Sequence, residues 1–196
     1  MGLLFQMLSN KQIKRLKHLD RNILRCQKCD GLRKNGISIP YWHKYSKYCL
    51  FVEAPGFEEI GKHPLVGKAG RKCFKLMKRY KFVRTDFFII NSVQCRPVVP
   101  FTNRNGKPRP SEQENCRFWI EKYLKTFKPQ AMLACGNYAT QYLFNENAGI
   151  QDKSGLLREY NGIPTVLSVH PASLLYEPQN KRRFFTALKK LKEVVR

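Results

Sequence analysis

The hydrophobic residues of the chain form two alternating kinds of segment. Short, continuous apolar runs predict buried β-strands, and longer stretches with an apolar residue every three or four positions predict helices. The strands are expected at residues 48–52, 87–90, 131–136 and 165–169. The helices are expected at residues 10–25, 68–80, 111–127, 137–144 and 182–195. Asn10 is the expected cap of the first helix, and Ser111 with Glu114 forms the expected capping box of the third.

The order of these elements predicts the fold class. Strands alternate with helices, and each strand is a continuous apolar run, which is typical of an α/β fold whose parallel sheet is covered on both faces. Ligands of such sheets bind at the carboxyl ends of the strands. Glu53, Asn91, Gly136 and His170 each stand at the carboxyl end of a predicted strand. We therefore expect an acid, an amide and an imidazole to gather at one rim of the sheet.

The charge of the chain indicates a polyanionic partner. Its 196 residues include 37 Lys and Arg against 14 Asp and Glu, which gives a formal net charge of +23. Three basic runs, residues 11–34, 62–84 and 181–196, carry nearly all of this charge. Nucleic acid is the favoured partner, and an anionic membrane surface is the alternative. The chain has no run of about 18 apolar residues, so we expect no membrane span. We also expect the protein to be cytoplasmic and monomeric.

The seven cysteines indicate a metal site rather than a disulfide scaffold. Cys26 and Cys29 have the spacing of a ligand pair, and Cys95 and Cys116 are two further candidates. Four thiolates can hold zinc or an iron–sulfur cluster. A zinc ribbon would have a second close pair, so the spacing favours a cluster and leaves zinc as the alternative. The other cysteines are expected in the hydrophobic core, and they are Cys49, Cys73 and Cys135.

Several motifs resemble the iron–sulfur uracil-DNA glycosylases, often called family four. They are VEAPG at 52–56, GKHPLVGKAG at 61–70, INSVQCRP at 90–97 and VHPASLL at 169–175. The resemblance runs from about Cys26 to the end of the chain. It implies a single domain over residues 1–196, a three-layer α/β/α sandwich with a central four-stranded parallel sheet. It also implies a 4Fe–4S cluster, and the family's pattern falls on Cys26, Cys29, Cys95 and Cys116.

The resemblance further implies a monofunctional DNA glycosylase of base excision repair. Such an enzyme flips a pyrimidine out of single- or double-stranded DNA and hydrolyses its N-glycosidic bond, leaving an abasic site. His170 would stabilise the departing base with an N–H group, Asn91 would read the pyrimidine edge, and Glu53 would face the sugar and the attacking water. The base pocket would consist of Ala54, Gly56, Glu59, Leu65 and Asn91.

The resemblance also implies how the DNA would be held. Leu174, four residues after His170, would fill the gap that the flipped base leaves in the stack. The basic residues expected to contact phosphates are Lys68, Arg71, Lys72, Arg96, Arg104, Lys181 and Arg182.

The chain departs from the family pattern in the base pocket. Leu65 stands where the family has a Phe that stacks on uracil, and base–aromatic stacking is worth about 1–3 kcal/mol. The segment between Gly56 and Pro64 is one residue shorter, Ala172 replaces the usual Ser, and the loop after Cys95 is longer. Uracil is the favoured substrate. A hydroxymethylated or glucosylated pyrimidine of phage DNA, removed in antiviral defence, is one alternative, and a non-catalytic, metal-stapled nucleic-acid-binding module is the other.

Overall fold

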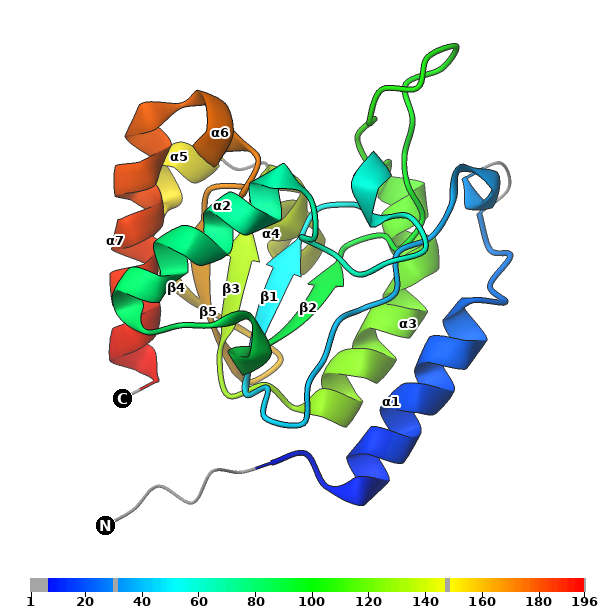
Figure 1. Ribbon diagram of the computed structural model, residues 1–196, viewed down its shortest axis with the longest axis horizontal. Helices are drawn as coiled ribbons and strands as arrows, with labels where there is room; N and C mark the ends of the chain where they lie inside the picture. The colour runs from blue at the N-terminus through cyan, green and yellow to red at the C-terminus, as the bar shows by residue number, and fades with distance from the viewer. Residues whose placement is uncertain (1–6, 30–31, 147–148, 196) are drawn as a thin grey trace.

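A five-stranded sheet forms the centre of the molecule (Figure 1). The computed structural model describes residues 7–29, 32–146 and 149–195. The strands, in their order across the sheet, are β2 (Phe87–Asn91), β1 (Tyr48–Val52), β3 (Met132–Cys135), β5 (Ile163–Ser168) and β4 (Leu157–Tyr160). The first four are parallel, and they are the four strands that the apolar runs predict. The predicted α/β class and four-stranded parallel sheet are confirmed.

The fifth strand, β4, is an addition to the expected sheet. It pairs antiparallel with β5 at the sheet edge, and three of its four residues are exposed. A polar, exposed strand gives no apolar run. A signal was nevertheless present, because Asn161-Gly162 is a typical two-residue hairpin turn. Both residues have positive φ angles, 50° and 78°, as that turn requires.

Helices cover both faces of the sheet. They are α1 (Asn10–Ile23), α2 (Lys68–Met77), α3 (Pro110–Phe127), α4 (Asn137–Phe144), α5 (Ile150–Lys153), α6 (Ser173–Tyr176) and α7 (Pro178–Val194). Residues of α1, α3 and α4 pack against one face, and residues of α2, α6 and α7 pack against the other. Figure 1 shows α1 and α3 side by side on the right and α7 on the left. None of the helices in the described part of the chain is long and apolar enough to cross a membrane.

Each strand contributes to both hydrophobic cores. In β1, Cys49 and Phe51 belong to the core under α1 and α3, whereas Leu50 and Val52 belong to the core under α2 and α7. This alternation follows from the two-residue period of a strand, and burial on both faces explains the continuous apolar runs. The three cysteines expected in the core are fully buried, as predicted: Cys49, Cys73 and Cys135.

Two predicted helix caps were wrong by one or two residues. Ser9, rather than Asn10, caps α1, and it exchanges hydrogen bonds with Gln12 in a capping box. Helix α3 begins at Pro110, whose fixed φ angle suits the first helical position. The Glu112 carboxylate, rather than that of Glu114, therefore accepts the Arg109 backbone N–H at 2.8 Å.

Candidate active site

The carboxyl ends of the parallel strands bring the predicted site residues to one rim. Asn91 ends β2, and Glu53 follows β1, its neighbour in the sheet. The Ser92 backbone N–H and hydroxyl both donate to the Glu53 carbonyl, at 3.1 and 2.6 Å, and tie these two ends together. On the other side of β1 in the sheet, Gly136 follows β3 and His170 stands just beyond β5. These two residues are close, because a Cβ on Gly136 would lie 3.0 Å from the Cβ of His170. The acid and the amide therefore stand on adjacent strand ends, and the imidazole follows β5, which β3 separates from β1, so all three lie at the carboxyl rim of the sheet as expected.

Asn91 is fully buried, and its side-chain amide has no partner within the described residues. Neither Nδ2 nor Oδ1 makes a hydrogen bond there. An unsatisfied buried polar group costs about 1–3 kcal/mol, so most such groups in proteins are paired. The backbone carbonyl of Asn91 is held by Gln94 Nε2 at 2.6 Å. A fixed backbone that carries a free donor and a free acceptor is a ready recognition element for a polar ligand.

His170 is held as a neutral imidazole with its proton on Nε2. The Ala172 backbone N–H donates to Nδ1 at 3.3 Å, so Nδ1 is the acceptor and Nε2 carries the hydrogen. Burial lowers the pKa of His170 to about 4. The Ser173 hydroxyl donates to the His170 carbonyl at 2.8 Å and fixes the start of α6. The ring is therefore positioned as a hydrogen-bond donor without a positive charge.

Glu53 is a half-buried carboxyl whose protonation changes near neutral pH. Burial raises the pKa of Glu53 to about 7, and the positive charge of Lys107 partly opposes this shift. Lys107 belongs to the long loop that follows β2, and its ammonium lies 5.9 Å from the centre of the Tyr138 ring. Lys107 is a site residue that the sequence analysis missed, since the path of a loop cannot be read from its composition.

Glu59 organises the loop that contains Leu65. Its carboxylate accepts the backbone N–H of Gly56 at 3.2 Å and of Leu65 at 2.7 Å. Leu65 is 6% exposed, belongs to the core under α2, and has a φ angle of 59°. A Cβ on Gly70 would lie 1.9 Å from the Leu65 carbonyl, so only glycine permits this approach of α2. Glu59 thus acts on the loop backbone, and Leu65 directs its side chain into the core.

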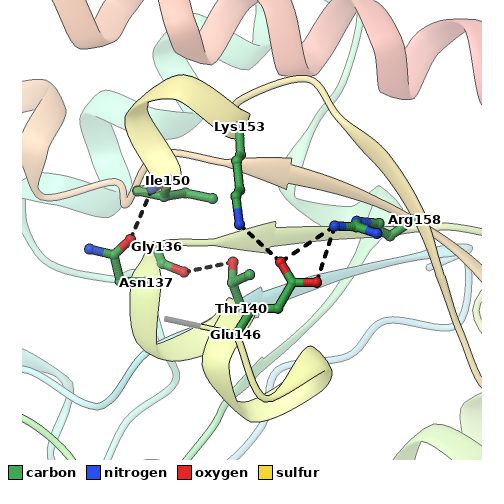
Figure 2. Close-up of polar contacts among 7 residues, drawn as sticks. All are labelled: Gly136, Asn137, Thr140, Glu146, Ile150, Lys153 and Arg158. Carbon is green, nitrogen blue, oxygen red and sulfur yellow. Dashed lines mark hydrogen bonds and ion pairs between the residues drawn. The ribbon is translucent and has the colours of Figure 1, made fainter. Parts of the chain in front are cut away.

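Hydrogen bonds and ion pairs hold the segment that follows β3 (Figure 2). The Thr140 hydroxyl donates to the Gly136 carbonyl at 3.1 Å, and the Ile150 N–H donates to Asn137 Oδ1 at 3.1 Å. Further along, the Glu146 carboxylate pairs with Lys153 at 2.9 Å and with Arg158 at 3.1 Å. The first two contacts fix the start of α4, where Gly136 makes room for His170, and the ion pairs of Glu146 hold the segment beyond the end of α4.

The four candidate ligand cysteines line one cavity between α1, α3 and the loop after β2. They are Cys26, Cys29, Cys95 and Cys116. The Gln94 N–H donates to Cys116 Sγ at 3.4 Å, and Asn115 Nδ2 donates to Cys29 Sγ at 3.7 Å. The described residues contain no group of three His, Cys, Asp or Glu side chains placed to hold a single metal ion. Four thiols that line one cavity, with N–H donors to two of the sulfurs, are a donor set of the kind that can ligate an iron–sulfur cluster.

Comparisons with known proteins assign the family. A family model described as the uracil DNA glycosylase superfamily matches residues 40–192. The chain belongs to this superfamily. It is 29% identical over 189 residues to a type-4 uracil-DNA glycosylase of Archaeoglobus fulgidus, covering 91% of this chain and 92% of the relative. It is 28% identical to the type-4 uracil-DNA glycosylase of Saccharolobus solfataricus, covering 88% of this chain and 83% of the relative. It is 25% identical to the type-4 uracil-DNA glycosylase of Thermotoga maritima, covering 84% of this chain and 85% of the relative. The superfamily consists of DNA glycosylases, which are hydrolases.

Arg96, one of the expected phosphate contacts, is buried and engaged within the protein. Arg96 is 4% exposed, and its guanidinium binds Asn105 Oδ1 at 2.8 Å and the Asn103 carbonyl at 2.6 Å. It also lies 5.1 Å from the centre of the Phe57 ring. The loop folds back over Arg96, since Asn103 and Asn105 both bind its guanidinium. Its charge therefore fixes the loop.

The expected stacking wedge also does not fit the geometry. Leu174 is 2% exposed and packs in the core under α2, because a helical turn directs that position inward. The exposed side chains of the same short helix are Leu175, at 38%, and Tyr176, at 79%. These two residues were missed, since a four-residue helix is too short for its apolar pattern to show which face is buried.

The other basic residues expected to bind DNA differ in whether groups of the protein already engage their side chains. Arg71 donates to the Val66 carbonyl at 2.9 Å and lies 3.8 Å from the Glu58 carboxylate. No ion pair within the described part of the chain engages the remaining side chains. They are Lys68, Lys72, Arg104, Lys181 and Arg182, and all are exposed or half-buried.

Proposed function

We propose that this protein is a monofunctional DNA glycosylase that excises uracil and leaves an abasic site. The observation that carries the proposal is the fully buried Asn91 amide, whose two polar atoms are unpaired among the described residues, at the same rim as the neutral His170. The names of the relatives support uracil as the base. The target must leave the base stack before it can reach a buried amide, so the reaction requires base flipping.

Asn91 recognises the extruded base. Its amide presents a donor and an acceptor side by side, and the pyrimidine edge of uracil offers an N–H and a carbonyl in the complementary arrangement. Binding would satisfy two buried groups at once. A base that cannot pair with both atoms would leave one of them unsatisfied, which costs about 1–3 kcal/mol. Asn91 therefore contributes to the choice of base as well as to its placement.

His170 stabilises the leaving group. As the N-glycosidic bond breaks, negative charge develops on the base, and the Nε2–H of a neutral imidazole can donate to its carbonyl oxygen. The pKa of about 4 keeps the ring neutral at physiological pH. Because the ring is already oriented by Ala172, no reorganisation is needed as the charge appears.

Glu53 acts as the general base that accepts a proton from the attacking water. The bond between C1′ and the base nitrogen breaks with its electron pair leaving on the base, and the water oxygen bonds to C1′. The released proton passes to the ionised Glu53 carboxylate, whose pKa of about 7 suits a general base near neutral pH. The carboxylate charge also stabilises the positive character of the sugar.

The four cavity-lining cysteines are proposed to hold a 4Fe–4S cluster. The cavity position of all four thiols and the two N–H···S contacts support this assignment. When bound, such a cluster supplies a cross-link between the end of α1, the loop after β2 and helix α3. No step of the reaction above requires it.

The decisive experiment offers oligonucleotides that contain uracil, hydroxymethyluracil or glucosylated hydroxymethylcytosine and measures alkali-labile abasic sites. Uracil is expected to be released. His170→Ala is expected to lower that rate by about 10²–10³-fold, the effect of removing one preorganised donor, with unchanged DNA affinity. His43→Ala is the matched control, since His43 precedes the opposite end of β1. Absence of uracil release at high enzyme concentration would refute the proposal.

A further inference from the structure

A second basic surface lies between α1 and α3. The two helices border a hollow of about 590 Å³. Every charged side chain that lines it is basic, and the lining residues include no Asp or Glu. The basic residues are Lys14, Arg15, His18, Arg21, Lys122, Lys125 and Lys128. Two segments about a hundred positions apart in the chain thus bring seven basic groups, and no acidic one, to one place.

This hollow is separate from the active site. Helix α3 begins near the rim, after the loop from β2, and ends at Phe127, shortly before β3 begins at Met132. Its last turns therefore lie by the amino ends of the strands, whereas Asn91 and His170 lie at the carboxyl ends. Figure 1 shows the lower halves of α1 and α3 side by side, away from the upper ends of the strands.

The charges of the hollow are not neutralised by nearby carboxylates. Among the residues that the structure describes, no carboxylate lies within 4.0 Å of its Lys or Arg side chains. The acid on α1 faces inward, because Asp20 accepts Trp42 Nε1 at 3.0 Å and the Tyr123 hydroxyl at 2.8 Å. Of the three glutamates of α3, Glu121 lies in its second half, next to the lining residue Lys122, and its carboxylate accepts the Tyr160 hydroxyl. The nearby negative charges are thus directed to other partners.

We propose that this hollow binds the phosphate backbone of DNA outside the segment that carries the excised base. The inference rests on the proposed function, which supplies DNA as the polyanion. Six exposed cations in one place repel one another, and phosphates relieve that repulsion while they release condensed counterions. Lys and Arg contacts to phosphates carry no sequence information. The hollow therefore adds affinity for flanking DNA and leaves the choice of base to the rim.

The test compares two triple variants of equal charge. The first is Lys14→Gln/Lys122→Gln/Lys125→Gln, which alters three lining residues. The control is Lys11→Gln/Lys17→Gln/Lys44→Gln, which changes three exposed lysines that do not line the hollow, two of them on the same helix α1. Affinity for undamaged duplex DNA of about 30 base pairs, roughly 100 Å at 3.4 Å per pair, is measured against salt concentration. Uracil release is measured on a duplex of about 10 base pairs.

The first variant is expected to lose affinity for the long duplex, and its salt slope is expected to fall by about 2–3, at about 0.9 per phosphate contact. The control is expected to retain the wild-type slope, and both variants should release uracil from the short duplex at the wild-type rate. Equal loss in the two variants would overturn the proposal, since it would reflect net charge alone.

A second measurement does not depend on the stability of either variant. In the wild-type protein, long duplex DNA should protect Lys122 and Lys125 from chemical acetylation more than it protects Lys11 and Lys17. Equal reactivity of all four with and without DNA would overturn the proposal. If the hollow binds DNA while no uracil is released, the proposed function fails and this inference stands, so the two can be told apart.

Discussion

Replacing Asn91 by Leu should stabilise the protein and abolish its activity. Asn91 is fully buried, and neither polar atom of its amide has a partner in the part of the chain that the structure describes, whereas Leu has a similar size without polar groups. Each unsatisfied buried group costs about 1–3 kcal/mol, and imperfect packing of the new side chain offsets part of the gain. We expect a net stabilisation of about 1–2 kcal/mol, which in a protein of this size raises Tm by about 2–4 °C per kcal/mol.

Asn180 provides the matched control. It is also a buried Asn, but its amide is paired: Nδ2 donates to Glu177 at 2.9 Å, and Oδ1 accepts from Arg183 at 3.0 Å. Asn180→Leu should therefore lower Tm and leave uracil release intact. Tm is read by thermal unfolding, and excision is read under single-turnover conditions. The reasoning would be refuted if Asn91→Leu lowered Tm as much as Asn180→Leu, or if it released uracil at the wild-type rate.

Three further predictions concern the acid, the short helix and the cysteines. Because burial raises the pKa of Glu53 to about 7 from its ordinary value of 4.5, excision should rise between about pH 6 and 8 as the carboxyl ionises. Glu53→Gln should remove that rise in the pH–rate profile. In the wild-type protein, the favourable effect of protonated Glu53 on stability is lost as the pH increases through 7. Leu174→Ala should destabilise the fold by about 2–5 kcal/mol in denaturant titrations, whereas Tyr176→Ala should change stability by less than about 0.5 kcal/mol and weaken binding to uracil-containing DNA. Cys26→Ala should lose the iron and the visible absorption of the purified protein, whereas Cys73→Ala should keep both, and zinc without iron in the wild type would contradict the cluster.

The sheet and its rim could be predicted because burial on both faces leaves a direct record in the sequence. A strand such as β1 must be apolar at every position, and the residue that follows it stands at the ligand-binding edge. Strand β4 leaves no such record, since it is exposed, and only its Asn-Gly turn marks it. The same physical reasoning therefore predicts the central strands and misses the edge.

The roles of individual side chains were harder to predict than their positions. Arg96 and Lys107 lie in the same loop region, yet Arg96 is buried under the loop, whereas the charge of Lys107 acts on the pKa of Glu53. Their difference depends on the path of the loop, which is set by contacts between distant residues. Likewise, Asn91 looks in the sequence like any residue that ends a strand, and only the structure reveals that its amide has no partner among the described residues.

The positions of the basic runs separate DNA affinity from base selection. The run in α2 and the run in α7 belong to the same side of the sheet, where α6 also packs, whereas the run in α1 borders the hollow with α3. The rim itself contains a buried amide, a neutral imidazole and a half-buried carboxyl whose pKa of about 7 leaves it only partly charged at neutral pH. Phosphate contacts weaken steeply with salt, whereas hydrogen bonds in a buried pocket are screened much less. High salt should therefore reduce DNA binding without reducing the preference for one base over another once the DNA is bound.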